Sequence, residues 1–233
     1  MLSVTIEAGG YSVREPLLRD ICFSVQPGEL VGLIGPNGAG KSTTLKALRG
    51  TLPYLRGSVQ LSPYGYVPER PLIYERLTLQ EHLDFLQTTL GGDEAPFAER
   101  ARRLLQCFQL TDAIHRFPDQ FSKGMQQKMM LVLAFLRRAD CYLIDEPFIG
   151  LDPHATKQLL HVIAEEKARG AAILMTTHVL DAAERVCDRF ILINGGRLIV
   201  QGTLAVLRQA SGLHEGTLLD CFDVLTAGHS DES

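Results

Sequence analysis

The sequence lacks any long hydrophobic run. Its longest apolar stretch, Met129–Leu136, is far shorter than the roughly 20 residues that a membrane-spanning helix requires. The N-terminal segment alternates in character and carries no basic leader, so we expect no signal peptide. Both absences favour a cytoplasmic protein, and they imply that any role at a membrane depends on a partner.

The sequence also lacks paired cysteines and a basic excess. Its 5 cysteines are scattered without a CxxC pair or a zinc-binding spacing, which is typical of reduced thiols. The 233 residues include 23 Lys and Arg against 27 Asp and Glu, giving a formal net charge of −4. Nucleic-acid-binding proteins usually carry a basic excess, so we expect no nucleic acid partner. A hydrophobic content of 45% excludes disorder throughout the chain.

Strand patterns alternate with helical patterns over most of the chain. This alternation predicts an α/β fold with a largely parallel sheet that is covered on both faces. The expected strands are 4–7, 17–25, 30–34, 59–61, 65–67, 141–144, 172–176, 190–193 and 198–200. The expected helices are 41–49, 78–90, 95–110, one that begins at Ser122, and 153–169.

The order of these segments predicts a single domain, 1–233, with an insertion. Residues 1–77 and 139–202 form the α/β core, 78–138 a helical subdomain, and 203–233 a helical appendix with a polar tail. Thr78 and Glu81 form a capping-box pattern at the start of the subdomain. His82 and His161 lie on expected helices, where we predict that they are surface residues.

A glycine-rich segment follows the apolar strand 30–34. It fits the pattern G-x-x-x-x-G-K-[ST], in which glycines allow backbone N–H groups to point at phosphate oxygens. The helix that follows directs its positive end at the same anion. We expect Lys41 to reach the β and γ phosphates and the Ser42 hydroxyl to hold Mg²⁺. The predicted ATP-binding residues here are Gly35, Pro36, Asn37, Gly38, Ala39, Gly40, Lys41, Ser42 and Thr43.

Two carboxylates follow the apolar strand 141–144. Ligands of open α/β folds bind at the carboxyl ends of the strands, so this position favours a role in the same site. Asp145 is suited to the Mg²⁺ shell, and Glu146 is suited to polarising an attacking water.

Further motifs resemble those of the ABC-type ATPases, over about residues 2–226. The run Phe121-Ser122-Lys123-Gly124-Met125-Gln126-Gln127-Lys128 resembles the signature sequence, and 146–153 resembles the D-loop segment, which contains Asp152. Thr176-Thr177-His178 resembles the switch-histidine segment. Tyr11 is similar to the aromatic residue that stacks on adenine.

The resemblance implies a P-loop NTPase (RecA-like) fold with a mostly parallel sheet, an antiparallel β part and an inserted helical subdomain. It implies ATP hydrolysis with Glu146 and His178 as catalytic residues, and Mg²⁺ at Ser42, Asp145 and Glu69. It also implies a head-to-tail dimer of nucleotide-binding domains. In that dimer the signature residues would contact the partner's ATP; they are Ser122, Lys123, Gly124 and Met125.

Several positions depart from the usual family motifs. The signature has Phe121, Lys123 and Met125 where Leu, Gly and Gln are usual, the D-loop has Ile149 in place of Ser, and Glu69 replaces the Q-loop glutamine. For Lys123 we favour a solvated helix residue over a charge near the partner's nucleotide. The methionines at 125, 129 and 130 are expected to pack in the core or on the subdomain.

Three segments resemble the ATP-binding subunits of ABC-2 class exporters, and within that class they are most similar to the Ecs-type transporter. They are Tyr74-Glu75-Arg76-Leu77-Thr78, Phe121-Ser122-Lys123-Gly124-Met125 and Thr217-Leu218-Leu219-Asp220-Cys221-Phe222. This resemblance implies a separate transmembrane exporter subunit as partner and a peripheral location on the inner face of the cell membrane. Two alternatives remain open. One is a soluble ABC ATPase that acts in translation or DNA repair, and the other is a nucleotide-dependent regulator with little turnover.

Overall fold

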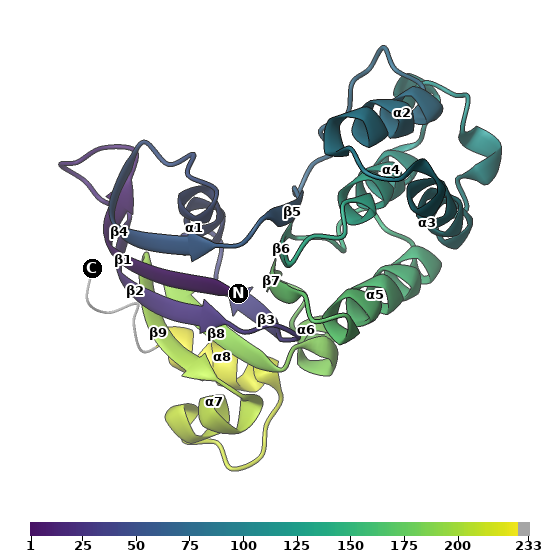
Figure 1. Cartoon of the computed structure of the whole chain (residues 1–233). Helices are drawn as coiled ribbons and strands as arrows, with labels where there is room; N and C mark the ends of the chain where they lie inside the picture. Colours follow the sequence, from purple (N-terminus) through teal and green to yellow (C-terminus); the bar gives the residue numbers. More distant parts are fainter. Residues whose placement is uncertain (228–233) are drawn as a thin grey trace.

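The computed structural model describes residues 1–227. Of the polar tail expected at 227–233, only Ala227 is described, and it is the last residue of a helix; 228–233 lie outside the described residues. Two sheets organise the chain (Figure 1). The smaller one is antiparallel, has the order β2-β1-β4, and consists of β1 (Leu2–Gly10), β2 (Leu18–Val25) and β4 (Tyr54–Leu61). The strand expected at 59–61 therefore begins earlier, because its first half pairs with the end of β1.

The larger sheet has six strands in the order β5-β6-β7-β3-β8-β9. Every neighbouring pair is parallel except β8–β9. A largely parallel sheet brings the carboxyl ends of β3, β6 and β7 to one edge. The strands are β3 (Leu30–Ile34), β5 (Tyr64–Val67), β6 (Cys141–Asp145), β7 (Ala172–Thr176), β8 (Arg189–Asn194) and β9 (Arg197–Gly202). The α/β prediction, with a parallel sheet and an antiparallel β part, is confirmed.

Successive side chains of β3 enter different cores, as expected for a strand that is covered on both faces. Val31 packs with α1 (Lys41–Leu48) and the antiparallel sheet. Leu30 faces the other way and packs with α5 (Pro153–Ala168). A third core lies under the C-terminal helices α6 (Leu180–Val186), α7 (Leu204–Ser211) and α8 (Leu218–Ala227). The short helix α6 was not predicted.

Three helices gather at one end of the molecule, away from the antiparallel sheet (Figure 1). They are α2 (Leu79–Leu90), α3 (Glu94–Cys107) and α4 (Lys123–Leu136), and the 3₁₀ turns η1 (Thr111–Ala113) and η2 (Pro118–Gln120) join α3 to α4. The capping box of Thr78 and Glu81 is present. α3 ends sooner than predicted, and Gln109 beyond it has a left-handed φ of 57°. None of the helices within residues 1–227 is long and apolar enough to cross a membrane.

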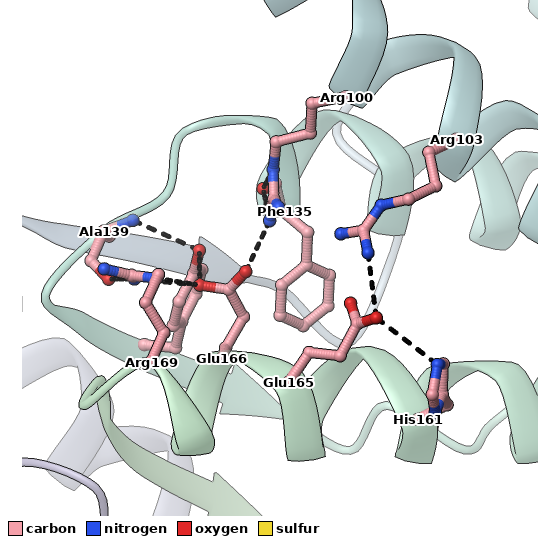
Figure 2. A network of polar contacts seen from close by, with 9 residues as sticks. Arg100, Arg103, Phe135, Ala139, His161, Glu165, Glu166 and Arg169 are labelled. Carbon is pink, nitrogen blue, oxygen red and sulfur yellow. Dashed lines mark hydrogen bonds and ion pairs between the residues drawn. The ribbon is translucent and has the colours of Figure 1, made fainter. Parts of the chain in front are cut away.

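A buried polar network ties α3 to the α/β core (Figure 2). Arg100 of α3 donates to Glu166 of α5 at 2.5 Å and, through two nitrogens, to the carbonyl of Phe135 in α4. Only 2% of the Glu166 side chain is exposed, and this carboxylate also accepts hydrogen bonds from Arg169 and the Tyr142 hydroxyl. Burial raises the pKa of Tyr142 to about 12, so the hydroxyl keeps the proton that it donates.

The prediction that His82 is a surface residue was wrong, whereas His161 is exposed as expected. The His82 ring is buried, and its Nε2 accepts the backbone N–H of Tyr74 at 3.0 Å. Its Nδ1 lies 2.8 Å from the carbonyl of Thr78. Because Nε2 acts as the acceptor, Nδ1 carries the proton, and the neutral ring joins the start of α2 to the loop before it.

Candidate active site

The glycine-rich loop between β3 and α1 borders a pocket of about 560 Å³. Gly38 and Gly40 have φ angles of 81° and 104°, values that side chains rarely adopt. A Cβ at Gly35 would lie 2.3 Å from the carbonyl oxygen of Ile193, so this position also requires glycine. The N–H of Ala39 donates to the carbonyl of Pro36 at 3.1 Å within the loop, and the curled backbone is of the kind that directs successive N–H groups at an anion.

Lys41, the first residue of α1, folds back over this loop. Its ammonium donates to the carbonyl oxygens of Gly35 at 2.7 Å and Pro36 at 3.1 Å. Burial lowers the pKa of Lys41, and the charges of Glu146 and Asp145 oppose that shift. The ammonium therefore lies close to two carboxylates without forming an ion pair with either of them among the described residues.

Asp145 ends β6 beside Thr176, the last residue of β7, and Glu146 follows directly. The Thr176 hydroxyl donates to Oδ1 of Asp145 at 2.6 Å. Burial raises the pKa of Asp145, and this hydrogen bond opposes the shift. The buried carboxylate therefore carries an electrostatic cost in its charged form, which is common for functional groups.

Glu146 contacts His178 directly. One carboxylate oxygen, Oε2, lies 2.8 Å from Nδ1 of His178 and accepts the backbone N–H of that residue at 3.1 Å. The Glu146 backbone is left-handed, with φ of 46°, and the histidine ring remains more than half exposed at the pocket. The two residues expected to be catalytic therefore lie together at the pocket wall.

The pocket brings together residues from distant parts of the chain. Glu69, which follows β5, lies on its wall with Glu146 and His178. The phosphate-loop residues that line it are Asn37, Gly38, Ala39, Gly40, Lys41, Ser42 and Thr43. Asp145 lies buried at the end of β6, next to this wall.

Sequence reasoning missed the turn between β8 and β9, which also lines the pocket. Gly195 and Gly196 have φ angles of 52° and 74°, and the N–H of Gly196 donates to the carbonyl of Ala39 at 3.0 Å. A Cβ at Gly196 would lie 1.6 Å from the carbonyl oxygen of Leu17. Two glycines between two strand patterns are a recognised hairpin signal, and this signal could have placed the turn.

The signature residues are separate from this pocket. Ser122 caps α4 by accepting the N–H of Met125, and Lys123 is exposed. None of residues 122–125 is among the described residues that line the pocket. Met125 is partly buried against the core cluster that α4 shares with α2, α3 and α5, and Met129 and Met130 are buried in that cluster, as predicted.

The signature segment instead lies against the D-loop of the same chain. A Cβ on Gly124 would come within 3.1 Å of the carbonyl oxygen of Gly150. Lys128 of α4 pairs with Oδ2 of Asp152 at 2.8 Å, while Oδ1 of Asp152 caps α5. The ion pair and the cap hydrogen bonds both lower the pKa of Asp152.

Tyr11 lies outside the described residues that line the pocket. Its ring is exposed, and its hydroxyl accepts a hydrogen bond of 2.7 Å from Lys46 of α1. The Lys46 ammonium also lies 5.1 Å from the ring centroid, close enough for a cation–π interaction. The tyrosine is thus attached to the helix that follows the phosphate loop.

The groups at the pocket suit a magnesium nucleotide. Mg²⁺ prefers hard oxygen ligands, and it is usually held by one or two carboxylates together with substrate phosphates. The Asp145 carboxylate and the Ser42 hydroxyl supply such oxygens. The glycine-rich loop and Lys41 supply donors and positive charge for the phosphates.

Comparison with known proteins identifies the family. Residues 18–149 match the family model described as ABC transporter. The chain belongs to this family. It is an ABC ATPase domain, with the P-loop NTPase fold of ATP-binding cassettes.

Two relatives from Bacillus subtilis match almost the whole chain. The ABC transporter ATP-binding protein YthP is 51% identical over 95% of each chain. The ABC-type transporter ATP-binding protein EcsA is 42% identical over 98% of this chain and 99% of its own length. A solved ATP-binding subunit of an ABC transporter, 41% identical, covers 97% of this chain and 99% of its own, with a TM-score of 0.92. The predicted family, including its Ecs-type character, is confirmed.

Proposed function

We propose that this ABC cassette hydrolyses ATP to drive a separate transmembrane exporter, through ATP-dependent pairing of two cassettes. The observation that carries the proposal is the contact between Glu146 and His178 at the wall of the phosphate-loop pocket. Similarity to EcsA, a transporter ATP-binding protein, supports the assignment to an Ecs-type transporter.

In the proposed reaction, Lys41 exchanges its two loop carbonyls for the β and γ phosphates of ATP. Ser42 and Asp145 would hold Mg²⁺, which would supply positive charge to the phosphates when bound. Glu146 accepts a hydrogen bond from the attacking water and orients it toward the γ phosphate. The backbone N–H of His178 holds the Glu146 carboxylate, and the His178 ring contacts the same phosphate, so the pair registers whether that phosphate is present.

We propose that a second copy of the chain completes each site. Ser122 begins a helix whose N-terminal N–H groups suit a phosphate, yet it lies outside the pocket of its own chain. A head-to-tail pair would place each signature segment, with Ser122, Lys123, Gly124 and Met125, against the partner's ATP. Because Lys128 ties α4 to Asp152, the signature and D-loop would meet the partner as one surface.

We further propose that residues 78–138 act as a subdomain that binds the membrane partner. Large apolar side chains are exposed just before this region and on its first helix, with Leu72 at 74%, Tyr74 at 60% and Phe85 at 51%. The Tyr74 and Phe85 rings meet edge to face at 5.7 Å. These side chains follow Glu69, which lines the pocket, so the segment between them connects the nucleotide to the docking surface.

Purification of the tagged chain from native membranes in mild detergent tests the proposal. We expect a polytopic membrane protein to copurify with the wild type and to be lost with the double variant Tyr74→Ser/Phe85→Ser. The matched control is Val206→Ser, an exposed apolar residue on α7. Copurification of ribosomes, or of no membrane protein, with the wild type would contradict the exporter assignment. Equal recovery of the membrane protein with the double variant would contradict the proposed docking surface.

Glu69 favours one alternative, a regulator with little turnover, because its carboxylate adds negative charge at the pocket. We propose that Glu69 instead reads the metal and transmits its state to the subdomain. Mg²⁺ titrations of ATP hydrolysis decide between these roles. Different Mg²⁺ dependence in Glu69→Gln and wild type supports metal sensing, whereas identical curves count against it.

A further inference from the structure

One hydroxyl group contacts both acidic residues of the site, the carboxylate of Asp145 and the backbone N–H of Glu146. Thr176 ends β7 and is fully buried, and its partner in the β6–β7 register is Asp145. Its Oγ1 donates to Oδ1 of Asp145 at 2.6 Å and accepts the backbone N–H of Glu146 at 3.1 Å. An ionised carboxylate can only accept and a backbone N–H can only donate, so the direction of both hydrogen bonds is fixed.

The same residue holds the unusual backbone of Glu146. The Glu146 N–H points at both oxygens of Thr176, the carbonyl and the hydroxyl, each at 3.1 Å. That N–H belongs to a residue with a left-handed φ of 46°, a conformation that is costly for a side chain other than glycine. The Glu146 side chain then reaches His178, two residues beyond Thr176. The Thr176 hydroxyl therefore contacts both the carboxylate of Asp145 and the backbone from which the Glu146 side chain projects.

We propose that Thr176 is a positioning residue, whose hydroxyl fixes the Asp145 carboxylate and the Glu146 backbone relative to each other. By occupying Oδ1 of Asp145, it leaves Oδ2 for the metal or its water shell. Among the described residues, none donates a hydrogen bond to Oδ2. The proposal rests on the proposed roles of Asp145 and Glu146.

Valine at this position would keep the shape of threonine and remove the hydroxyl. Asp145, 6% exposed, would lose a donor in a place where water reaches it poorly. Removing a group that orients a metal ligand typically costs about 10- to 100-fold in metal affinity or activity. A role limited to packing would instead tolerate valine and respond to the smaller serine.

The test compares the hydroxyl-free variants Thr176→Val and Thr176→Ala with the hydroxyl-retaining Thr176→Ser. Three quantities are measured on the full chain: kcat and KM for ATP, Mn²⁺ affinity by electron paramagnetic resonance with a non-hydrolysable ATP analogue, and analogue affinity in EDTA. We expect Thr176→Val to lose about 10- to 100-fold in kcat and Mn²⁺ affinity, with analogue affinity in EDTA unchanged. Thr176→Ser should retain both. Thr176→Ala provides a second hydroxyl-free chain if valine prevents folding.

Two results would overturn the proposal: wild-type kcat and Mn²⁺ affinity in the folded hydroxyl-free variants, or equal losses in Thr176→Ser and Thr176→Val. Failure of the proposed function is seen separately, in the wild type. If the wild-type chain does not hydrolyse ATP, the assigned activity is wrong, and the Mn²⁺ affinities still decide the role of Thr176.

Discussion

Replacing Arg100 by methionine should destabilise the chain far more than the same change at its neighbour Arg103. Arg100 is 8% exposed and bonds both Glu166 and the Phe135 carbonyl. Breaking a buried ion pair costs about 3–5 kcal/mol. Because Arg169 and Tyr142 still contact Glu166 after the change, we expect the lower end, about 3 kcal/mol. In a chain of this size that loss lowers Tm by about 6–12 °C.

Arg103 provides the matched control (Figure 2). It lies one helical turn from Arg100 on α3 and pairs with Glu165, but its side chain is 51% exposed. Exposed pairs contribute about 0–1 kcal/mol, so Arg103→Met should lower Tm by at most about 4 °C. Thermal unfolding followed by circular dichroism measures both shifts.

Equal Tm shifts for Arg100→Met and Arg103→Met would refute the reasoning, because burial would then not determine the cost. A double-mutant cycle with Glu166→Gln isolates the pair itself. If the ion pair itself stabilises the fold, the double variant should lose clearly less free energy of unfolding than the sum of the two single losses. A coupling near zero would assign the loss to the Phe135 carbonyl alone.

Three further predictions concern the pocket. Glu146→Gln should bind ATP, hydrolyse it poorly and accumulate as a dimer in size-exclusion chromatography; full turnover would exclude Glu146 as the base. Tyr11→Ala should weaken ATP binding by about 5- to 150-fold, the range that loss of base stacking gives, and unchanged affinity by calorimetry would remove Tyr11 from the site. Asp145→Asn should raise Tm at neutral pH, because burial raises the pKa of Asp145 in the folded chain and its ionised form therefore destabilises the fold. As pH falls through the raised pKa, Asp145 becomes protonated in the folded chain and its destabilising charge is lost. The gain in Tm from Asp145→Asn should therefore disappear near the ordinary pKa of 3.8. An equal gain in Tm at neutral pH and near pH 3.8 would contradict this account.

Elements with strong local signals could be predicted from the sequence. The uniformly buried strands β3, β6 and β7 appear where expected, and α2 and α4 begin after Thr78 and Ser122. Hydrophobic patterns and helix caps depend on residues within a few positions of each other, so one sequence is sufficient to find them. The phosphate loop and the acids after β6 follow from the same local reasoning.

Features that depend on tertiary contacts could not be predicted in this way. His82 was predicted to be a surface residue from its position on an expected helix, yet its ring is buried and accepts a hydrogen bond from Tyr74 in the preceding loop. The pairing of Arg100 with Glu166 joins residues far apart in the chain. The contact between the signature glycine, Gly124, and Gly150 likewise depends on how α4 packs beside α5.

The left-handed backbone at Glu146 has a consequence for engineering this chain. Glycine is the residue that this φ of 46° favours, so Glu146→Gly would relieve a local strain of about 1–2 kcal/mol while removing the proposed base. A screen that rewards heat resistance alone would therefore tend to select an inert cassette. Directed evolution of this protein should hold position 146 fixed and seek its gains elsewhere.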